Sequence, residues 1–144
     1  MGGSAGLTRM KATARRDGGG FRHSIQLNEH QLTVDEPVAA GGEDAGPSPQ
    51  QLLAVSLASC TAITMEMYAA RKGWEIGHVE VDVEYSPAER GCPTKFELVV
   101  RLPDDLPEDQ VDRLRAIAAK CPVHRVLDGE VMFLERVERV HMAA

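Results

Sequence analysis

Alternating apolar and polar positions predict short strands in the first quarter of the chain. Between residues 21 and 34, the positions that alternate with polar neighbours are Phe21, His23, Ile25, Leu27, Leu32 and Val34. The alternation is interrupted by Asn28-Glu29, and a period of two on either side of a polar pair is typical of a hairpin with one buried face. A loop rich in glycine and proline, EPVAAGGEDAGP, follows.

A long helix is predicted from about Pro49 to Lys72. Ser48 suits the N-cap, Pro49 the first helical position and Gln51 the capping-box position, and Gly73 ends the pattern. At 1.5 Å per residue the helix would be roughly 35 Å long. Its inward stripe is expected to be Leu52, Leu53, Ser56, Cys60, Ile63, Met67 and Ala70. Because many of its residues are small, other elements could approach it closely, and we interpret it as the central helix of the fold.

The second half of the chain returns to strands and then to shorter helices. Two alternating runs, residues 79–85 and 96–102, predict a second hairpin through the loop SPAERGCPT. A helix is predicted from about Pro107 to Lys120 and is interrupted by Pro122, with a short helical turn, PVHRVLDG, after it. A last strand is expected from Val131 to Val140. Strands and helices in separate blocks predict an α+β fold.

Composition narrows the class of protein. A length of 144 residues fits a single domain over 1–144, of which residues 1–6 are expected to be disordered or foreign to the natural protein. The net charge of −6 does not suggest a nucleic-acid partner, because binding to a nucleic acid usually requires a basic patch. The longest apolar run, Leu52 to Met65, is 14 residues long and therefore short for a membrane span. Three cysteines without an export signal indicate a reducing compartment, so we expect a cytoplasmic protein.

Two of the three cysteines occupy positions where chemistry is conceivable. Cys60 lies in the middle of the long helix on its predicted inward stripe, where a cysteine also serves as a small core side chain. Cys121 is a candidate N-cap of the helical turn that starts at Pro122, a position that would favour a thiolate through the helix dipole. A zinc site formed by Cys121 and His124 with Cys92 and His141 is a weak alternative, because the chain has no CxxC pair.

Two segments carry a resemblance to a known family. GPSPQQLLAVSLASCTAITMEMYAARKGW resembles the central helix of the OsmC/Ohr family, and AAKCPVHRVLDGEV resembles that family's second cysteine segment. The OsmC-like branch is the most similar, with Asp35-Glu36-Pro37 before a GG-x-D-x-GPSP loop and then SCT-x-x-T and YA-x-RKGW. The similarity covers about residues 20 to 140, with both cysteine segments in the family's order and separation.

The resemblance implies a fold, an assembly and a reaction. It implies an OsmC-like α+β fold, with a long central helix and a second helix packed by antiparallel sheets, made as an intertwined homodimer. It implies a thiol-dependent peroxidase in which Cys60 attacks a hydroperoxide and becomes a sulfenic acid, and Cys121 condenses with it to a disulfide. An external dithiol, such as the lipoyl group of a partner protein, would reduce the pair. No metal or organic cofactor is implied.

The sequence departs from the best-characterised branch at the residues around the reactive cysteine. That branch has an arginine and a glutamate there, and the glutamate position corresponds to Gln50, which carries no charge. Arg16, in ARRDG, is the best match for the arginine, and Arg22 competes with it. The lost acid keeps a second function open, namely a redox-sensing or small apolar ligand-binding dimer with weak or no peroxidase activity.

Overall fold

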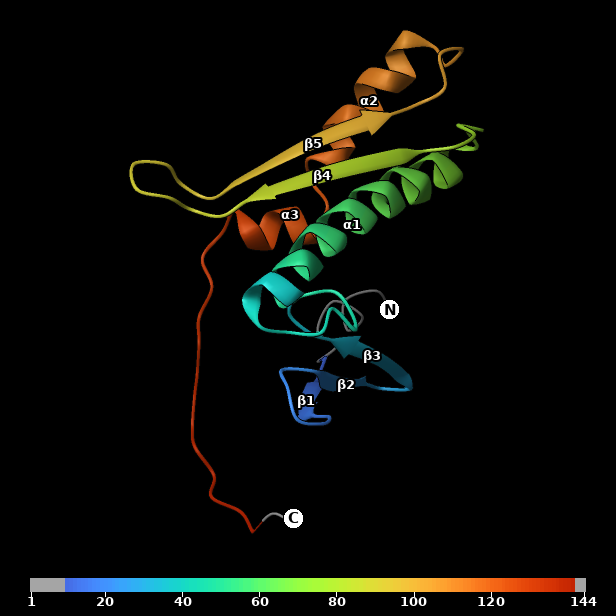
Figure 1. Cartoon of the computed structure of the whole chain (residues 1–144). Coiled ribbons are helices and arrows are strands. Elements are labelled where there is room, and N and C mark those ends of the chain that lie inside the picture. Colours follow the sequence, from blue (N-terminus) through green and yellow to red (C-terminus); the bar gives the residue numbers. More distant parts are fainter. Residues whose placement is uncertain (1–9, 142–144) are drawn as a thin grey trace. The chain divides into compact units, whose positions relative to one another are not determined.

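The computed structural model describes residues 10–141 and divides into two compact units. Of the described residues, unit 1 contains those up to Ala58 together with Val81–Val100, and unit 2 contains Ser59–Glu80 and those from Arg101 to residue 141. The end at residues 1–6 that was expected to be disordered lies outside the described residues, and the assignment of a single domain remains a prediction. Helices and antiparallel strands occur in both halves of the sequence, as Figure 1 shows, which confirms the α+β class.

Unit 1 begins with a three-stranded antiparallel sheet in the order β1-β2-β3. The strands are β1 (Ala12–Arg16), β2 (His23–Leu27) and β3 (His30–Val34). Ile25 of β2 pairs with Ala14 of β1 and with Leu32 of β3. The turn between β2 and β3 places Asn28 at a positive φ of 54°, a conformation that asparagine tolerates better than most residues. The hairpin predicted from the alternation is therefore confirmed, and β1 extends it by one strand.

Helix α1 (Pro49–Lys72) has the predicted ends because its caps form as the sequence indicates. Ser48 Oγ accepts a hydrogen bond from the Gln51 backbone N–H at 3.1 Å, and Gln51 Oε1 accepts one from the Ser48 N–H at 2.8 Å. This reciprocal pair is a capping box. At the other end Gly73 adopts a φ of 72°, the left-handed conformation in which glycine commonly ends a helix.

The buried face of α1 differs from the predicted one. The residues that the chain buries are Leu57, Thr61, Met65, Tyr68 and Ala69. The predicted inward stripe was wrong for the single chain, because Leu53, Ser56, Ile63, Met67 and Ala70 are exposed, and Leu52 and Cys60 are half-buried. A helix with apolar residues on every side has no single apolar stripe, so periodicity could not select the face that the chain covers.

The helix is also long and apolar enough to cross a membrane, judged by length and composition alone. The whole helix satisfies this criterion although its longest uninterrupted apolar run is only 14 residues long. Core helices of proteins outside membranes pass the same test, so this property is weak evidence for a membrane span.

Strands β4 (Glu80–Ser86) and β5 (Lys95–Arg101) form the second predicted hairpin. The apolar residues of β4 are half-buried, whereas Glu80, Asp82 and Glu84 form its exposed face, as the alternation indicated. Near the turn the rings of Tyr85 and Phe96 lie 4.9 Å apart between their centroids. This pairing of aromatic side chains across the two strands stabilises their register.

Unit 2 contains the two shorter helices, α2 (Glu108–Ala118) and α3 (Pro122–Leu127). The predicted helix from Pro107 is confirmed, although it ends at Ala118 rather than near Lys120. Pro122 starts α3 at its first position, as a residue with a fixed φ and no N–H suits a helix start. Leu114, Ala118 and Cys121 are buried, which places the second cysteine in the core of unit 2.

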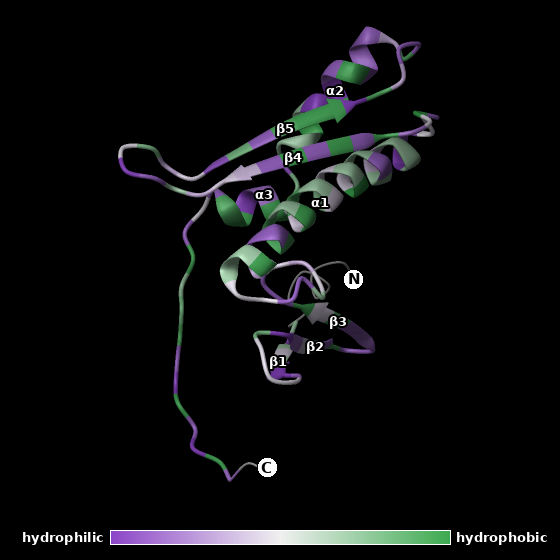
Figure 2. Ribbon diagram, in the orientation of Figure 1, coloured by the Kyte–Doolittle hydropathy of each residue, from purple (hydrophilic) through white to green (hydrophobic). Residues whose placement is uncertain are grey.

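The last strand, expected from Val131 to Val140, is not formed. Residues 130–141 have neither helix nor strand, and Figure 2 shows apolar and polar residues mixed along this extended segment. Its large apolar side chains are exposed, Leu134 and Val137 to about nine-tenths. A strand is stabilised by backbone hydrogen bonds to a neighbouring strand. In the single chain none of the described strands pairs with this segment.

Candidate functional site

Cys121 occupies the N-cap of α3, as predicted from its position before Pro122. Its backbone is extended, with φ −65° and ψ 148°, and its sulfur accepts a hydrogen bond from the His124 backbone N–H at 3.3 Å. The side chain is fully buried. Pro122 has no N–H, so the first backbone donors of α3 come from the residues that follow it. The sulfur therefore replaces the oxygen that serine or aspartate would supply at such a position.

Cys121 lies against the turn of α1 that carries Cys60. Its Sγ is 3.7 Å from the Oγ1 of Thr61, the residue directly after Cys60, and Thr61 is also fully buried. Both cysteines have free thiols and belong to unit 2. The structure thus brings the two predicted reactive segments together through the contact of Thr61 with Cys121, residues that are 60 positions apart in the sequence.

Cys60 and Cys92 have different surroundings. Cys60 is half-buried, and its Sγ lies 3.9 Å from the Thr64 hydroxyl one turn along α1. Cys92 is exposed in the loop between β4 and β5, where Glu89 and Cys92 form an isolated antiparallel bridge. Cys92 is therefore a solvent-exposed thiol.

Tyr68 links α2 to α1 in the same unit. Arg113 donates from Nε to the Tyr68 hydroxyl at 2.8 Å, and this hydrogen bond is the main reason that the pKa of Tyr68 lies below its ordinary value. Burial acts in the opposite direction, and the positive charges of Arg113, Lys72 and Arg71 add to the lowering. The ring also meets Trp74 edge-on, with centroids 5.6 Å apart. These contacts hold α2 on α1 and so contribute to the position of Cys121.

The other predicted site residues lie in unit 1. Arg16 donates to the carbonyl oxygen of Gly19 at 2.6 Å, and Gln50 is exposed in the first turn of α1. Arg22 donates from Nε to the Asp17 carbonyl at 3.0 Å and forms ion pairs with Asp17 at 3.5 Å and with Glu43 at 3.9 Å.

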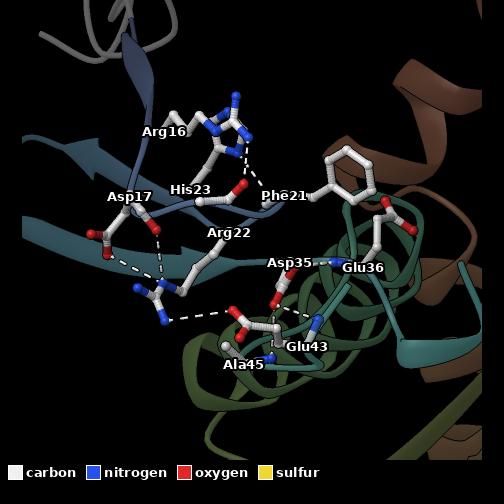
Figure 3. Close-up of polar contacts among 10 residues, drawn as sticks. Arg16, Asp17, Phe21, Arg22, His23, Asp35, Glu36, Glu43 and Ala45 are labelled. Carbon is white, nitrogen blue, oxygen red and sulfur yellow. Dashed lines mark hydrogen bonds and ion pairs between the residues drawn. The ribbon is translucent and has the colours of Figure 1, made fainter. Parts of the chain in front are cut away.

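Figure 3 shows the guanidinium of Arg22 between the side chains of Asp17 and Glu43. The two acids that pair with Arg22 are therefore Asp17, in the connection between β1 and β2, and Glu43, in the loop before α1. Neither is the residue at position 50. Sequence reasoning missed Glu43, although it lies in the quoted GG-x-D loop.

The loop that carries Glu43 is organised by Asp35, which is also buried. One Asp35 carboxylate oxygen accepts from the Glu36 N–H at 2.7 Å, and the other accepts from Glu43 at 3.2 Å and Ala45 at 3.1 Å. These bonds, that from Ala45 foremost, hold the pKa of Asp35 below its ordinary value although burial acts to raise it. Figure 3 shows the carboxylate enclosed by the loop.

Unit 1 also contains a hollow of about 500 Å³. It is lined by residues of α1, β4 and β5, namely Ala54, Val55, Ala58, Val81, Asp82, Val83, Glu84, Glu97 and Val99. Its lining includes neither Cys60 nor Cys121. Within residues 10–141, no three His, Cys, Asp or Glu side chains gather into a group that could hold a metal ion.

The sequence of this chain matches the profile of a known protein family. The profile described as OsmC-like protein matches residues 41–134, well over half of the chain, including α1, both cysteine segments and the strands between them. The chain belongs to the OsmC-like family. The resemblance inferred from the two cysteine segments is thereby confirmed.

Solved structures of other OsmC-like proteins share this fold. An OsmC-like protein from Mycoplasma pneumoniae is 20% identical, with a TM-score of 0.70 over 85% of this chain and 89% of that chain. The organic hydroperoxide resistance protein OhrB of Bacillus subtilis is 28% identical, with a TM-score of 0.58 over 85% and 93%. An organic hydroperoxide resistance protein from Elizabethkingia anophelis is 22% identical, with a TM-score of 0.65 over 85% and 90%. A search of curated proteins found no match.

Proposed function

We propose that this OsmC-like protein is a cysteine-based hydroperoxide reductase that protects against oxidative stress. In the first step the Cys60 thiolate attacks the O–O bond of a hydroperoxide, ROOH. The sulfur takes one oxygen and is oxidised to a sulfenic acid, and the other oxygen leaves with a proton as the alcohol ROH.

In the second step Cys121 attacks the sulfenic sulfur of Cys60. The S–S bond forms as the S–O bond breaks, and the hydroxyl leaves as water with the thiol proton. An external dithiol then reduces the disulfide by thiol–disulfide exchange and is itself oxidised to a disulfide. We propose a lipoyl group on a partner protein as this dithiol, with no metal or organic cofactor.

One observation carries the proposal: the buried Cys121 contacts the residue next to Cys60. Two cysteines that form a disulfide must reach a Cα separation of about 7 Å or less. The 3.7 Å contact between Thr61 and Cys121 supports such an approach of Cys121 to Cys60. Two of the solved structures with this fold are described as organic hydroperoxide resistance proteins, which supports a hydroperoxide as the substrate.

We further propose that an arginine supplies positive charge to the Cys60 thiolate. Arg22 is the stronger candidate because Asp17 and Glu43 hold its guanidinium, whereas the guanidinium of Arg16 donates to the backbone carbonyl of Gly19. Gln50 would then contribute hydrogen bonding without charge. An opposite charge favours the thiolate over the thiol, and the thiolate is the nucleophile.

A peroxide-consumption assay tests the function. The protein is supplied with dihydrolipoamide and, in turn, with hydrogen peroxide, an alkyl hydroperoxide and a fatty-acid hydroperoxide. Turnover should be highest with an organic hydroperoxide and should be abolished in Cys60→Ser. The exposed-thiol variant Cys92→Ser should retain turnover. If the unmodified protein consumes no peroxide with any of these substrates, the proposed function is wrong.

The hollow in unit 1 supports a second candidate function, the binding of a small apolar ligand. Its apolar side chains suit a hydrocarbon group, and about 500 Å³ is within the usual size of a ligand site. Such a protein would use the cysteines, at most, to sense oxidants. The test is a titration with a fluorescent fatty acid. Binding with micromolar affinity that is lost in Ala58→Trp, in a protein without peroxidase activity, would favour this function.

A further inference from the structure

The contact between Thr61 and Cys121 suggests a role for a residue that the proposed reaction does not use. The Thr61 Oγ1 and the Cys121 Sγ are 3.7 Å apart, and both side chains are fully buried. A threonine in a helix has only two favoured χ1 rotamers, and its complete burial against Cys121 further restricts the hydroxyl. Thr61 therefore presents a polar group from the central helix at a defined position in the core of unit 2.

The sulfur of Cys121 is approached from two sides. The His124 backbone N–H of α3 donates to it at 3.3 Å, and the Thr61 hydroxyl of α1 lies within hydrogen-bond distance for sulfur. Contacts from two different helices restrict the rotation of the Cys121 side chain. The two contacts also place the sulfur between α3 and the turn of α1 that carries Cys60.

The second threonine of the SCT-x-x-T motif lies one turn further along α1. Thr64 is within 3.9 Å of the Cys60 sulfur, whereas Thr61 meets Cys121. Each thiol thus has a threonine hydroxyl of the same helix beside it. Because Thr61 follows Cys60 directly, the same turn of α1 carries the Cys60 thiol and contacts the Cys121 thiol.

We propose that Thr61 is a positioning residue whose hydroxyl holds the Cys121 thiol against α1, so that disulfide formation outruns further oxidation of Cys60. This inference rests on the proposed function. The Cys60 sulfenic acid has two fates. Attack by Cys121 gives the disulfide and water, whereas a second hydroperoxide gives a sulfinic acid and an alcohol. Thr61 would favour the first fate.

The test compares Thr61→Val, which keeps the shape but removes the hydroxyl, with Thr61→Ser, which keeps the hydroxyl. The matched control is Thr94→Val on an exposed threonine before β5. Each full-length reduced protein receives one equivalent of cumene hydroperoxide, is quenched with an alkylating reagent and is mapped by mass spectrometry. Thr61→Val should form the Cys60–Cys121 disulfide roughly fivefold more slowly, the effect of one lost hydrogen bond, and should accumulate Cys60 sulfinic acid. Thr61→Ser and Thr94→Val should match the unmodified protein.

A second measurement separates this inference from the proposed function. In the absence of peroxide, iodoacetamide should alkylate Cys121 at a different rate in Thr61→Val than in the unmodified protein, with the rate at Cys60 unchanged and with Thr61→Ser restoring the original rate. Failure of the unmodified protein to oxidise Cys60 would overturn the proposed function, and the alkylation rates would still test Thr61. Equal disulfide rates and equal alkylation rates in Thr61→Val would overturn the inference. If Thr61→Val does not fold, Thr61→Ala provides the same comparison.

Discussion

Asp35 determines the conformation of the loop before α1. Its buried carboxylate accepts hydrogen bonds from three backbone N–H groups, those of Glu36, Glu43 and Ala45. The loop also passes so close to its neighbours that a side chain at Gly42 would meet the backbone of Glu36. Through Glu43 the same loop supplies one of the two acids that pair with Arg22.

We expect Asp35→Asn to destabilise the protein at neutral pH and to loosen the loop. The amide cannot accept as many hydrogen bonds as the carboxylate, and its NH₂ group would face backbone donors. The measurement is the thermal unfolding midpoint of both proteins across pH, with Asp105→Asn on an exposed turn as the control.

The pH dependence has a defined sign. Because the pKa of Asp35 is lower in the folded protein than in the unfolded chain, its stabilisation is complete above the unfolded value of about 3.9. It is lost as the pH falls through the lower pKa of the folded state. The difference between Asp35→Asn and the unmodified protein should therefore be constant near neutral pH and should shrink in acid. A difference that grows in acid would contradict the role given to the carboxylate.

At the scale of the elements, α1 depends on local signals at its ends and on tertiary contacts along its length. The capping box of Ser48 and Gln51 satisfies backbone donors that the first turn of a helix cannot pair internally. Between its ends, contacts with α2 and with the start of α3 select the face that the chain buries. The two cysteine segments approach each other only because these contacts form.

We expect Ser48→Ala to lower the free energy of unfolding by about 1 kcal/mol, because the first turn of α1 loses its capping hydroxyl. Urea unfolding at a fixed protein concentration measures the loss. Ser48→Asp keeps an acceptor at the N-cap and should retain most of the stability. If both substitutions cost the same, the hydroxyl does not act as a cap.

The link between α1 and α2 is expected to show in the titration of Tyr68. In a Tyr85→Phe background Tyr68 is the only tyrosine, so phenolate absorbance reports its pKa alone. Arg113→Gln should raise that pKa, because the hydrogen bond and the positive charge that favour the phenolate are removed. Arg115→Gln, two residues along α2, is the control and should leave the titration unchanged. An unchanged titration in Arg113→Gln would show that Arg113 does not bond Tyr68 in solution.

At the scale of the whole molecule, the single chain leaves much apolar surface uncovered. On α1 the exposed large side chains include Leu53, Val55, Ile63 and Met67. Residues 130–141 add further apolar side chains, of which Phe133 and Leu134 are mostly exposed. Extended apolar patches of this kind on a protein surface usually mark an interface.

We expect the protein to be a homodimer that covers this surface with a second copy of the chain. Light scattering should give twice the chain mass of 15.7 kDa at micromolar concentration. Ile63→Glu places a charge on the exposed apolar face of α1 and should shift the protein toward monomer or aggregate, whereas Glu66→Gln on the same helix should leave the dimer intact. A stable monomer of the unmodified protein would refute this prediction.

Features that depend on neighbouring residues in the sequence were predictable. The ends of α1 follow from Ser48, Gln51 and Gly73, and the N-cap role of Cys121 follows from its position before Pro122. Strand alternation located both hairpins, because side chains of a strand point to opposite faces with a period of two. The family could also be inferred, since the two cysteine segments stand as short continuous stretches of sequence.

Features that depend on which surfaces meet were decided only by the tertiary structure. The apolar residues on every side of α1 allowed several inward faces, and packing of unit 2 selected the one that contains Thr61 and Met65. The strand expected at residues 131–140 shows the same limit, because alternation indicates a strand but does not supply the neighbour that its backbone must pair with. The contact of Thr61 with Cys121 joins residues 60 positions apart, and no local pattern could have indicated it.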